Sequence, residues 1–526
     1  MRKLFFSFFI LISALGYAQD EQHFITYYDT AHLVKRSEGD RLDGKETGLW
    51  KYWFRTGKLM EETEYRQGFV NGKQIVYFEN GTKELENYYT RGFRDSIYLT
   101  WYENGKSKER GFFKKDACDS IWMFWNEDGT VWKKEECKNG SRFIIDFFDK
   151  DQKQVVTNGN GALTYYFDSG ELREESVIKD GLRNGASIKF FENGNKKHVG
   201  QFANGIPNGS WKYWYDDNTL WKEMTFVNGE INGPYILHFK NEQISHKGQY
   251  LKGNRDGKWE AFFDNGDKDW VGEYVEGKEH GHWMVYFRNG KLESEGTYAL
   301  GQKNGLWTYY YEGGEKFRSG NYKDNLEEGE WSSWWENGQV FTNGNYVNGK
   351  EEGQWVSFYK SGKPKDSGSF SAGKLDGNWK GWFEKSRSGK SNLKYQGKWD
   401  NGVRTGEWTF WFPNDIMREH GNYKDNLRDG KWEYFTEYGK PESGGSYNEG
   451  SKTGKWYFNY PQGQIKREQT YKNDRPNGEC KVFTERGVLV NHSNFKNGRL
   501  DGKYKVYDEK GNLKQTRVFK DGKKVK

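Results

Sequence analysis

A 24-residue repeat runs through nearly the whole of this 526-residue chain and constrains its fold more than any other feature. Residues 257–280 and 281–304 align without a gap, and the spacing continues at Gly305, Gly329 and Gly353. A period of roughly 20 to 50 residues is typical of repeat architectures, in which each repeat packs mainly against its neighbours. The repeat therefore excludes a series of independent globular domains for nearly everything after residue 47.

Each repeat, counted from its first Gly as position 0, reads G-x-W, an aromatic pair at positions 5 and 6, N-G, an aliphatic residue, G-x-Y and a Gly-bearing connector. A five-residue insertion in EKSRSGKSN, residues 384–392, is the one displacement of the count after Gly161. The chain thus holds about 20 repeats. The remaining starts are Gly48, Gly72, Ser96, Ser120, Gly161, Gly185, Gly209, Gly233, Gly377, Gly406, Gly430, Gly454, Gly478 and Gly502.

Two strand signals and two turn signals occur in each repeat. The first strand is short and aromatic, and it ends at Asn265-Gly266, a dipeptide that predicts a two-residue type I′ hairpin turn. The second strand passes through Gly272 and Tyr274 to the connector Gly277. In other repeats the connector residue is Asp116, Asn325, Asn426 or Asp474. Asn and Asp tolerate the left-handed region best after Gly, so we expect positive φ there.

These signals predict an all-β fold, an elongated β-hairpin repeat solenoid of about 20 units of 24 residues. With Asn-Gly at the hairpin tip, positions whose indices sum to 17 face each other, which places Trp259 opposite Gly272 as in aromatic rescue of a strand glycine. Positions 6, 11 and 17 are expected on the same face. The structural repeat aromatics of this face are Trp259, Trp283, Trp307, Trp331, Trp355, Tyr274 and Tyr298.

The opposite face carries a second row of aromatics, at position 5, among Lys, Glu, Asp, Ser and Thr. Their expected spacing of about 10 Å suits stacking along a polymer. Stacking between repeats, with a purely structural role, is the alternative. The candidate partner-contacting residues in this row are Trp214, Tyr286, Trp334, Trp382 and Trp411.

Five segments are expected along the chain. Residues 1–18 have the pattern of a signal peptide, with Arg2 and Lys3, an apolar run to Leu15 and Gly-Tyr-Ala before Gln19. This predicts export, to the periplasm, the outer surface or the medium, and no later run is long enough to predict an integral membrane segment. The other segments are a lead-in cap at 19–47, divergent repeats at 48–160, regular repeats at 161–405 and C-terminal repeats at 406–526.

The charge pattern argues against a nucleic acid partner. Lys and Arg total 82 and Asp and Glu 76, a net charge of +6, and the two signs are interleaved throughout. Nucleic acid binding instead uses basic blocks that neutralise phosphates. We therefore expect a solvated repeat surface.

No constellation of catalytic, cofactor-binding or metal-binding residues emerges, so we expect no enzyme activity. His280 and His282 flank Gly281, but no third ligand repeats nearby. The glycines follow turn spacing rather than that of a phosphate-binding loop. Cys137 replaces a position-17 aromatic and Cys480 a position-2 Trp. Cys118 should lie diagonal to Cys137 on one hairpin face, which leaves a disulfide open as one possibility.

The motifs GEYVEGKEHGHWMVYFRNG (272–290), GTYALGQKNGLWTYYYEGG (296–314) and GNYVNGKEEGQWVSFYKSG (344–362) resemble MORN-type repeats. They are similar to the bacterial variant seen in the YwqK-type antitoxin family. The resemblance implies a β-hairpin solenoid used for protein or membrane-surface interaction. Two departures from an antitoxin are the expected export signal and the length of the chain.

Three functional hypotheses follow. The first is an exported, non-catalytic repeat scaffold that binds an unidentified protein partner, with an antitoxin or immunity role as one form. The second is binding of a glycan or cell-wall polymer through the position-5 aromatics, because GKWYFNYPQG (454–463) also resembles the hairpins of cell-wall-binding repeats. The third is a cryptic enzyme, which no residue pattern supports.

Overall fold

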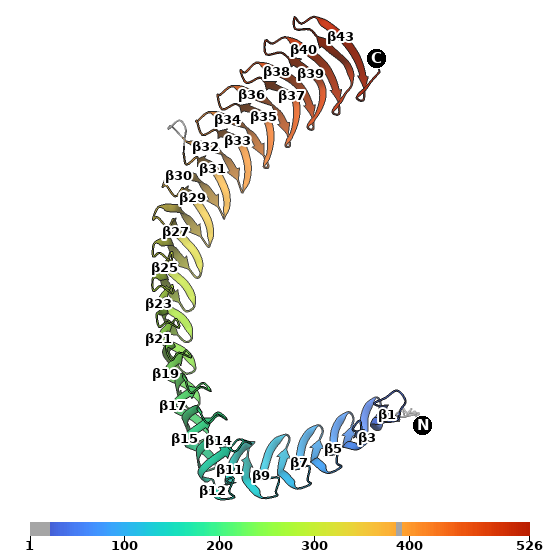
Figure 1. The fold of residues 1–526 in the computed structure, drawn as a ribbon, viewed down its shortest axis with the longest axis vertical. Helices are drawn as coiled ribbons and strands as arrows, with labels where there is room; N and C mark the ends of the chain where they lie inside the picture. Colours follow the sequence, from blue (N-terminus) through green and yellow to red (C-terminus); the bar gives the residue numbers. More distant parts are fainter. Residues whose placement is uncertain (1–20, 386–391, 526) are drawn as a thin grey trace, which may run out of the picture. The chain divides into compact units, whose positions relative to one another are not determined.

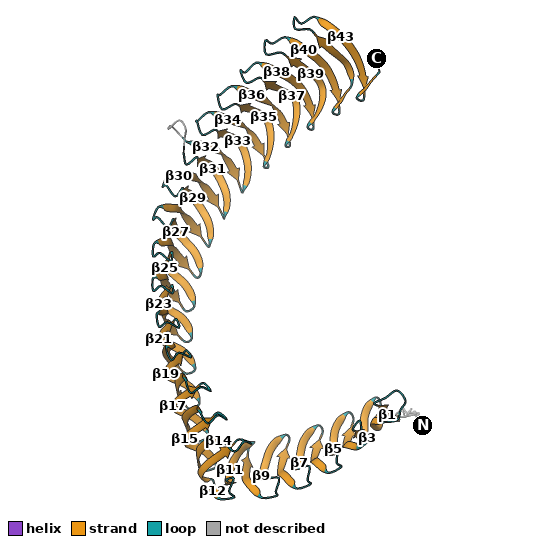
Figure 2. Cartoon of the chain, in the orientation of Figure 1, coloured by secondary structure: helices purple, strands orange, loops and turns teal. Residues whose placement is uncertain are grey.

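Every regular element in this computed structural model is a β-strand (Figure 1, Figure 2). The structure describes residues 21–385 and 392–525, so the expected signal peptide at 1–18 and the centre of the insertion lie outside the described residues. Two compact units divide the chain. The N-terminal unit is Met1–Gln243 with Tyr250–Gly253, and the C-terminal unit is Ile244–Gln249 with Asn254–Lys526.

In the N-terminal unit each strand pairs antiparallel with its neighbours in sequence, as β3, β4 and β5 do. The strands are β1 (Glu21–Tyr27), β2 (Lys35–Leu42), β3 (Lys45–Trp53), β4 (Leu59–Arg66), β5 (Phe69–Tyr77), β6 (Lys83–Thr90), β7 (Phe93–Trp101), β8 (Ser107–Lys114), β9 (Ala117–Trp125), β10 (Val131–Lys138), β11 (Ser141–Phe148), β12 (Gln154–Thr157), β13 (Asn160–Tyr166), β14 (Leu172–Lys179), β15 (Leu182–Phe190), β16 (Lys196–Ala203), β17 (Ile206–Trp214), β18 (Leu220–Val227) and β19 (Glu230–His238).

The C-terminal unit repeats the same antiparallel meander, as β23, β24 and β25 illustrate. Its strands are β20 (Ile244–Leu251), β21 (Asn254–Phe262), β22 (Lys268–Val275), β23 (Lys278–Tyr286), β24 (Leu292–Ala299), β25 (Gln302–Tyr310), β26 (Lys316–Lys323), β27 (Leu326–Trp334), β28 (Val340–Val347), β29 (Lys350–Phe358), β30 (Pro364–Ser371), β31 (Lys374–Trp382), β32 (Leu393–Asp400), β33 (Val403–Trp411), β34 (Met417–Lys424), β35 (Leu427–Phe435), β36 (Pro441–Asn448), β37 (Ser451–Asn459), β38 (Ile465–Lys472), β39 (Arg475–Phe483), β40 (Leu489–Lys496), β41 (Arg499–Leu500), β42 (Gly502–Tyr507), β43 (Leu513–Lys520) and β44 (Lys523–Lys524). The all-β repeat fold is confirmed.

The Asn-Gly turn differs from the expected type I′ turn. The Phe263 amide donates to the Asp267 carbonyl at 2.8 Å, and the Gly266 amide donates to the Phe263 carbonyl at 2.9 Å. Gly266 has φ 88°, whereas Asn265 is not among the residues with positive φ. This is a type I turn followed by one left-handed Gly, the usual three-residue hairpin loop. The type I′ prediction was therefore wrong at this turn.

The type I′ geometry occurs instead at the connector between repeats. Glu276 and Gly277 have φ values of 50° and 80°, and they join Val275 to Lys278, which pair across the ladder. Two consecutive left-handed residues match the right-handed twist of the flanking strands. The non-glycine connectors Asp116, Asn325, Asn426 and Asp474 have φ values of 65°, 69°, 65° and 61°. Their predicted left-handed backbone is confirmed.

The predicted register holds for most of each hairpin and then shifts by one residue. Trp259 pairs with Gly272, as an index sum of 17 requires, but Phe262 pairs with Lys268 because the ladder is irregular between Ala261 and Phe262. Position 11 therefore lies across from position 5. The expectation that position 11 joins the tryptophan face was wrong, because a bulge reverses the parity of everything beyond it.

A shortened repeat in the N-terminal unit has a core of a different kind. Around β11 and β12 the buried side chains are Phe147, Val156, Leu163 and Ile178, in place of an indole. Phe147 pairs with Val156, and β12 has only four residues. Phe147 and three aliphatic side chains therefore form the buried core where the repeat is incomplete, and Trp132 and Tyr165 pack against them.

Candidate functional site

One face of the sheet, which we call the tryptophan face, is built by indoles that reach across to the preceding repeat. A side-chain carbon added at Gly272 would overlap the indole of Trp283, eleven residues later. Trp283 Nε1 donates to the carbonyl of Glu273 at 3.2 Å and so holds the ring over the preceding strand. Trp259 is the hairpin partner of Gly272, but its ring covers Gly248. Each of these strand glycines is therefore covered by the tryptophan of the following repeat and not by its hairpin partner in the same repeat.

The indoles alternate with position-17 rings along this face of the C-terminal unit. Trp283 meets Tyr298 at 5.6 Å between centroids, and Tyr298 meets Trp307 at 5.0 Å, both edge to face. Such pairs add about 0.5–1.5 kcal/mol beyond their buried area. Of the structural repeat aromatics, Trp259, Trp283, Trp307, Trp331 and Tyr274 are buried, whereas Trp355 and Tyr298 are half-buried.

In several repeats a cation from the chain itself occupies the outer side of this ladder. Lys303 Nζ lies 4.2 Å from the Trp307 ring centroid, 5.2 Å from Tyr309 and 5.4 Å from Tyr322. Burial lowers the pKa of Lys303. The cation is four residues before the tryptophan that it covers, and the same spacing recurs in Arg255–Trp259, Arg404–Trp408, Arg428–Trp432 and Lys452–Trp456.

A carboxylate nine residues before the cation completes the cage of Trp432, and the same ion-pair spacing occurs without an indole at Arg183, whose fourth following residue is Ser187. Arg428 Nη2 lies 2.8 Å from Glu419 Oε2, and in the N-terminal unit Arg183 Nε lies 2.7 Å from Glu174 Oε1. Burial alone would raise the pKa of Glu174, but the hydrogen bond and charge of Arg183 hold this pKa below its usual value. The cage is thus a built motif of indole, aromatic ring, cation and carboxylate.

The tryptophan face opens into a hollow where the position-4 aromatic is missing. Tyr309 stacks beside Trp307 at 6.0 Å, and Phe410 stacks beside Trp408 at 5.8 Å. In the three repeats between them, position 4 is Ser333, Ser357 and Gly381. A hollow of about 310 Å³ results, which we call the aromatic groove, lined among others by Trp355, Asp366, Phe370, Trp379, Tyr395 and Trp399. An adjoining hollow of about 240 Å³ shares Trp355 and Thr342 with it.

A single carboxylate, that of Asp366, lines the aromatic groove. Its Oδ1 accepts a hydrogen bond from the Tyr395 hydroxyl at 2.6 Å, and its Oδ2 accepts one from Ser357 Oγ at 3.3 Å. Burial, together with this hydrogen bond, raises the pKa of Tyr395, so the phenol stays a donor at neutral pH. The groove therefore combines apolar ring faces with a fixed negative charge, the composition of a small binding site.

The position-5 aromatics lie on the opposite, charged face, each at the end of its strand. Trp214, Tyr286, Trp334, Trp382 and Trp411 are all half-buried. Each pairs with an aliphatic or Met residue at position 11, respectively Leu220, Leu292, Val340, Leu393 and Met417. Across the described part of the chain, none of the five contacts another aromatic ring, so ring stacking between repeats is not supported for them; Lys316 Nζ lies 6.0 Å from the ring centroid of Trp334.

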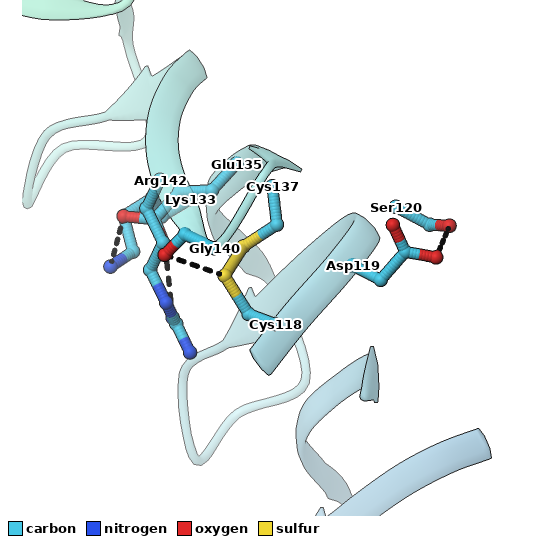
Figure 3. The surroundings of a disulfide bond; sticks show 8 residues. All are labelled: Cys118, Asp119, Ser120, Lys133, Glu135, Cys137, Gly140 and Arg142. Carbon is cyan, nitrogen blue, oxygen red and sulfur yellow. Dashed lines mark hydrogen bonds and ion pairs between the residues drawn. A yellow bond between two sulfur atoms is a disulfide. The ribbon is translucent and has the colours of Figure 1, made fainter. Parts of the chain in front are cut away.

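Cys118 and Cys137 form a disulfide with a Cα–Cα distance of 5.7 Å (Figure 3). Beside it, Arg142 Nη1 lies 3.1 Å from Glu135 Oε2 and its guanidinium covers the Trp122 ring at 4.3 Å. The disulfide therefore joins two strands of one aromatic cluster. Cys480 is a free, buried thiol in a position that holds tryptophan in other repeats.

Two further searches of the described residues gave negative results. Residues 21–385 and 392–525 contain no group of three or more His, Cys, Asp or Glu side chains arranged to hold a metal ion. His280 and His282 both lie in β23, and neither belongs to such a group in that part of the chain. The same residues contain no helix long and apolar enough to cross a membrane.

Comparison with known families gives eight matches to the profile described as MORN repeat variant. The chain carries MORN-type repeats. Each MORN match begins near a connector and covers one hairpin of the tryptophan face. The matched segments are residues 46–67, 94–115, 207–228, 279–299, 327–348, 404–425, 452–473 and 500–521.

No curated protein matches the chain significantly. Among solved structures, the crystal structure of TcdB2-TccC3-TEV is 9% identical over 95% of this chain and 31% of that chain, with a TM-score of 0.14. The Tc holotoxin pore of Photorhabdus luminescens is 10% identical over 90% of this chain and 28% of that chain, with a TM-score of 0.13. This chain thus spans less than a third of these chains, and TM-scores this low do not establish a shared fold.

Proposed function

We propose that this protein is an exported, non-catalytic scaffold whose MORN repeats bind a protein partner through the aromatic groove. The observation that carries the proposal is the interruption of the tryptophan face at Ser333, Ser357 and Gly381. In the flanking repeats Tyr309 and Phe410 stack beside Trp307 and Trp408, whereas here Trp355 remains half-exposed beside a hollow. Open, well-packed aromatic side chains beside a few polar groups are typical of the anchor pockets of protein interfaces.

The non-catalytic part of the proposal is supported by the kind of groups in the groove. Ring faces, hydroxyls and one carboxylate can bind and orient a partner. A nucleophile held by a base would be the arrangement expected for covalent catalysis. Asp366 already accepts two hydrogen bonds from within the chain, which fixes its position as a counter-charge.

Export is supported by the pattern of residues 1–18 and by the Cys118–Cys137 disulfide, since disulfides persist mainly in oxidising compartments. An immunity role, as in the YwqK-type antitoxin family, is one form that the scaffold could take in the cell envelope. Genomic neighbours test it directly, because an adjacent toxin or effector gene would favour this role.

The decisive experiment is affinity capture from envelope extract with the full chain and a variant whose groove is filled. Ser357→Tyr restores the position-4 ring that Tyr309 provides elsewhere, so it should preserve the thermal unfolding temperature and remove the captured protein. The matched control is the charged-face triple variant Trp334→Ala, Trp382→Ala and Trp411→Ala, which should still capture it. Capture that Ser357→Tyr leaves unchanged would contradict binding at the groove.

The position-5 aromatics favour a second candidate function, binding of a glycan or cell-wall polymer on the charged face. The five rings have no ring partner in the described chain and recur at repeat spacing. The same triple variant tests the idea, because it should abolish sedimentation with insoluble cell-wall polysaccharide while unfolding at nearly the wild-type temperature. Unchanged sedimentation would exclude this role for the three residues.

A further inference from the structure

In the aromatic groove, Trp379 lacks the cation that lies four residues before the tryptophan in the cages described above. In the cage of Trp432, Arg428 covers the indole at 4.5 Å and pairs with Glu419, nine residues earlier. The corresponding residues in the groove are Leu375, four before Trp379, and Asp366, nine before Leu375. The carboxylate, the indole and the preceding position-17 ring, Phe370, are thus retained, whereas the position-4 ring is absent and a leucine stands where the arginine would be.

The neighbouring cage at Trp355 has also lost its cation. Glu351 is four residues before Trp355, at the place that Lys303 has in the cage of Trp307. Over the described ranges of the chain, no Lys or Arg lies against the ring of Trp355 or of Trp379. Phe370 touches both indoles edge to face, at 5.8 Å from Trp355 and 5.3 Å from Trp379, so the two cages adjoin.

We propose that the groove binds an arginine side chain of the protein partner, with its guanidinium over Trp379 and its charge against Asp366. The inference rests on the proposed function and names the chemistry of that partner. A cation over an indole is attracted to the negative face of the ring, and the attraction grows when water is excluded. Asp366 is the charged residue that lines the groove, and its negative charge complements a cation, while Arg404 lies over Trp399, 5.2 Å from its ring centroid.

Arginine fits better than lysine or a neutral sugar, because the cage with a carboxylate at the place of Asp366, that of Trp432, holds an arginine, whereas the lysine cages of Trp307 and Trp456 have Ser294 and Ser443 at that place. A guanidinium can stack flat on an indole and still direct N–H groups to a carboxylate, as Arg428 does with Trp432 and Glu419. A lysine ammonium can satisfy one of these contacts well but has no planar surface. A neutral sugar would leave the charge of Asp366 without a counter-charge.

The test uses the full chain and the peptide acetyl-Gly-Arg-Gly-amide, followed by the indole N–H signals in NMR and by tryptophan fluorescence. The matched control ligand replaces Arg with citrulline, which has nearly the same shape and no charge. We expect saturable binding of the arginine peptide and binding about tenfold weaker or more for the citrulline peptide. Equal binding of the two peptides, or tighter binding of a neutral oligosaccharide such as chitotriose, would overturn the inference.

Two variants locate the site. Leu375→Arg supplies the missing cation from within, so it should unfold at the wild-type temperature or above and bind the peptide at least tenfold more weakly. Leu375→Met is its control and should bind normally. Asp366→Asn provides a second route if Leu375→Arg fails to fold, and it should also weaken binding. Wild-type affinity in a folded Leu375→Arg or in Asp366→Asn contradicts the assignment.

The outcome separates this inference from the proposed function. If the peptide does not bind but Ser357→Tyr still abolishes capture of the envelope protein, the scaffold function stands and the arginine assignment fails. If the peptide binds and no protein is captured at the groove, the cation site stands and the protein-binding function fails.

Discussion

Trp283 covers Gly272, which lies eleven residues earlier in the preceding repeat, so closely that a methyl group on Gly272 would overlap the indole. The same relationship joins a glycine and a tryptophan at twelve places among the described residues, from Gly39 and Trp50 to Gly445 and Trp456. Where the glycine position holds Ser176 or Gln469, the later residue is Ser187 or Cys480. Each of these indoles therefore packs against the preceding repeat as well as its own. The glycine in the preceding repeat leaves the space that the indole fills.

Gly272→Ala should destabilise the fold by about 1–3 kcal/mol, because the added methyl group must displace the indole of Trp283. Urea unfolding measures the effect. A double-mutant cycle identifies the clashing ring, since the cost should nearly disappear in a Trp283→Ala background and persist in a Trp259→Ala background. The reverse pattern would show that the hairpin partner governs packing.

Connector substitutions should follow the left-handed backbone. Gly301, with φ 89°, is the second residue of a type I′ turn that another repeat builds with Asn325. Gly301→Asn should change the free energy of unfolding by only a few tenths of a kcal/mol, whereas Gly301→Ala should cost about 1–2 kcal/mol. Denaturant midpoints of the two variants provide the comparison, and equal costs would contradict the φ argument.

The Cys118–Cys137 disulfide determines how many free thiols the protein should have before and after reduction. The unreduced, denatured protein should show one free thiol, that of Cys480, and three after reduction. Reduction should destabilise the N-terminal unit by about 2–4 kcal/mol, because the bond closes a loop over a sequence separation of 19. Thiol titration and thermal unfolding of Cys118→Ser check both points. Three thiols without reduction would exclude the bond.

His198 should make the N-terminal unit sensitive to acid. Burial, and then the charge of Lys189, lower the pKa of His198 to about 4, against an unfolded value of 6.5. The unfolded state therefore binds the proton first, so the stabilising contribution is complete above about pH 6.5 and is lost as the pH falls towards about 4. His198→Phe should keep the contact with Trp211 and flatten this dependence.

Denaturant midpoints measured between pH 7 and pH 4.5 test the prediction. Wild type should lose stability relative to His198→Phe as the pH falls. His23 offers an opposite control, because the hydrogen bonds that it donates to Asp40 and Glu38 raise its pKa, so its stabilising contribution is present below about pH 6.5. Parallel curves for wild type and His198→Phe would refute the assigned direction.

Most of the repeat's backbone plan was predictable because it depends on local residue types. The left-handed connector at Asn325 and the pairing of Trp259 with Gly272 follow from turn preference and index arithmetic. The type I′ turn was assigned to the wrong one of two turns, because Asn-Gly also suits a type I turn ending in a left-handed Gly, as at Gly266. The bulge after Ala261 could not be predicted, because nothing local distinguishes a shifted ladder from a regular one.

The aromatic groove was not found from the sequence, although two signals were present in it. One is the run of small residues Ser333, Ser357 and Gly381 at a position that holds rings in the flanking repeats, as Tyr309 and Phe410, and the other is Leu375 in place of Arg or Lys. Both have meaning only once Lys303 and Arg428 are seen lying over their indoles. The sequence predictions concentrated instead on the charged face, where Trp214, Tyr286, Trp334, Trp382 and Trp411 contact no other aromatic ring within the described chain.

The sequence by itself determined that this protein is a stack of two-stranded modules, since the period, the turn residues and the alternation of strands are local properties of the chain. Only the tertiary structure decided which repeat each indole packs against and where the tryptophan face lies open. That choice depends on distances between side chains eleven or more residues apart. A residue pattern can be compatible with several such arrangements, and packing selects one of them.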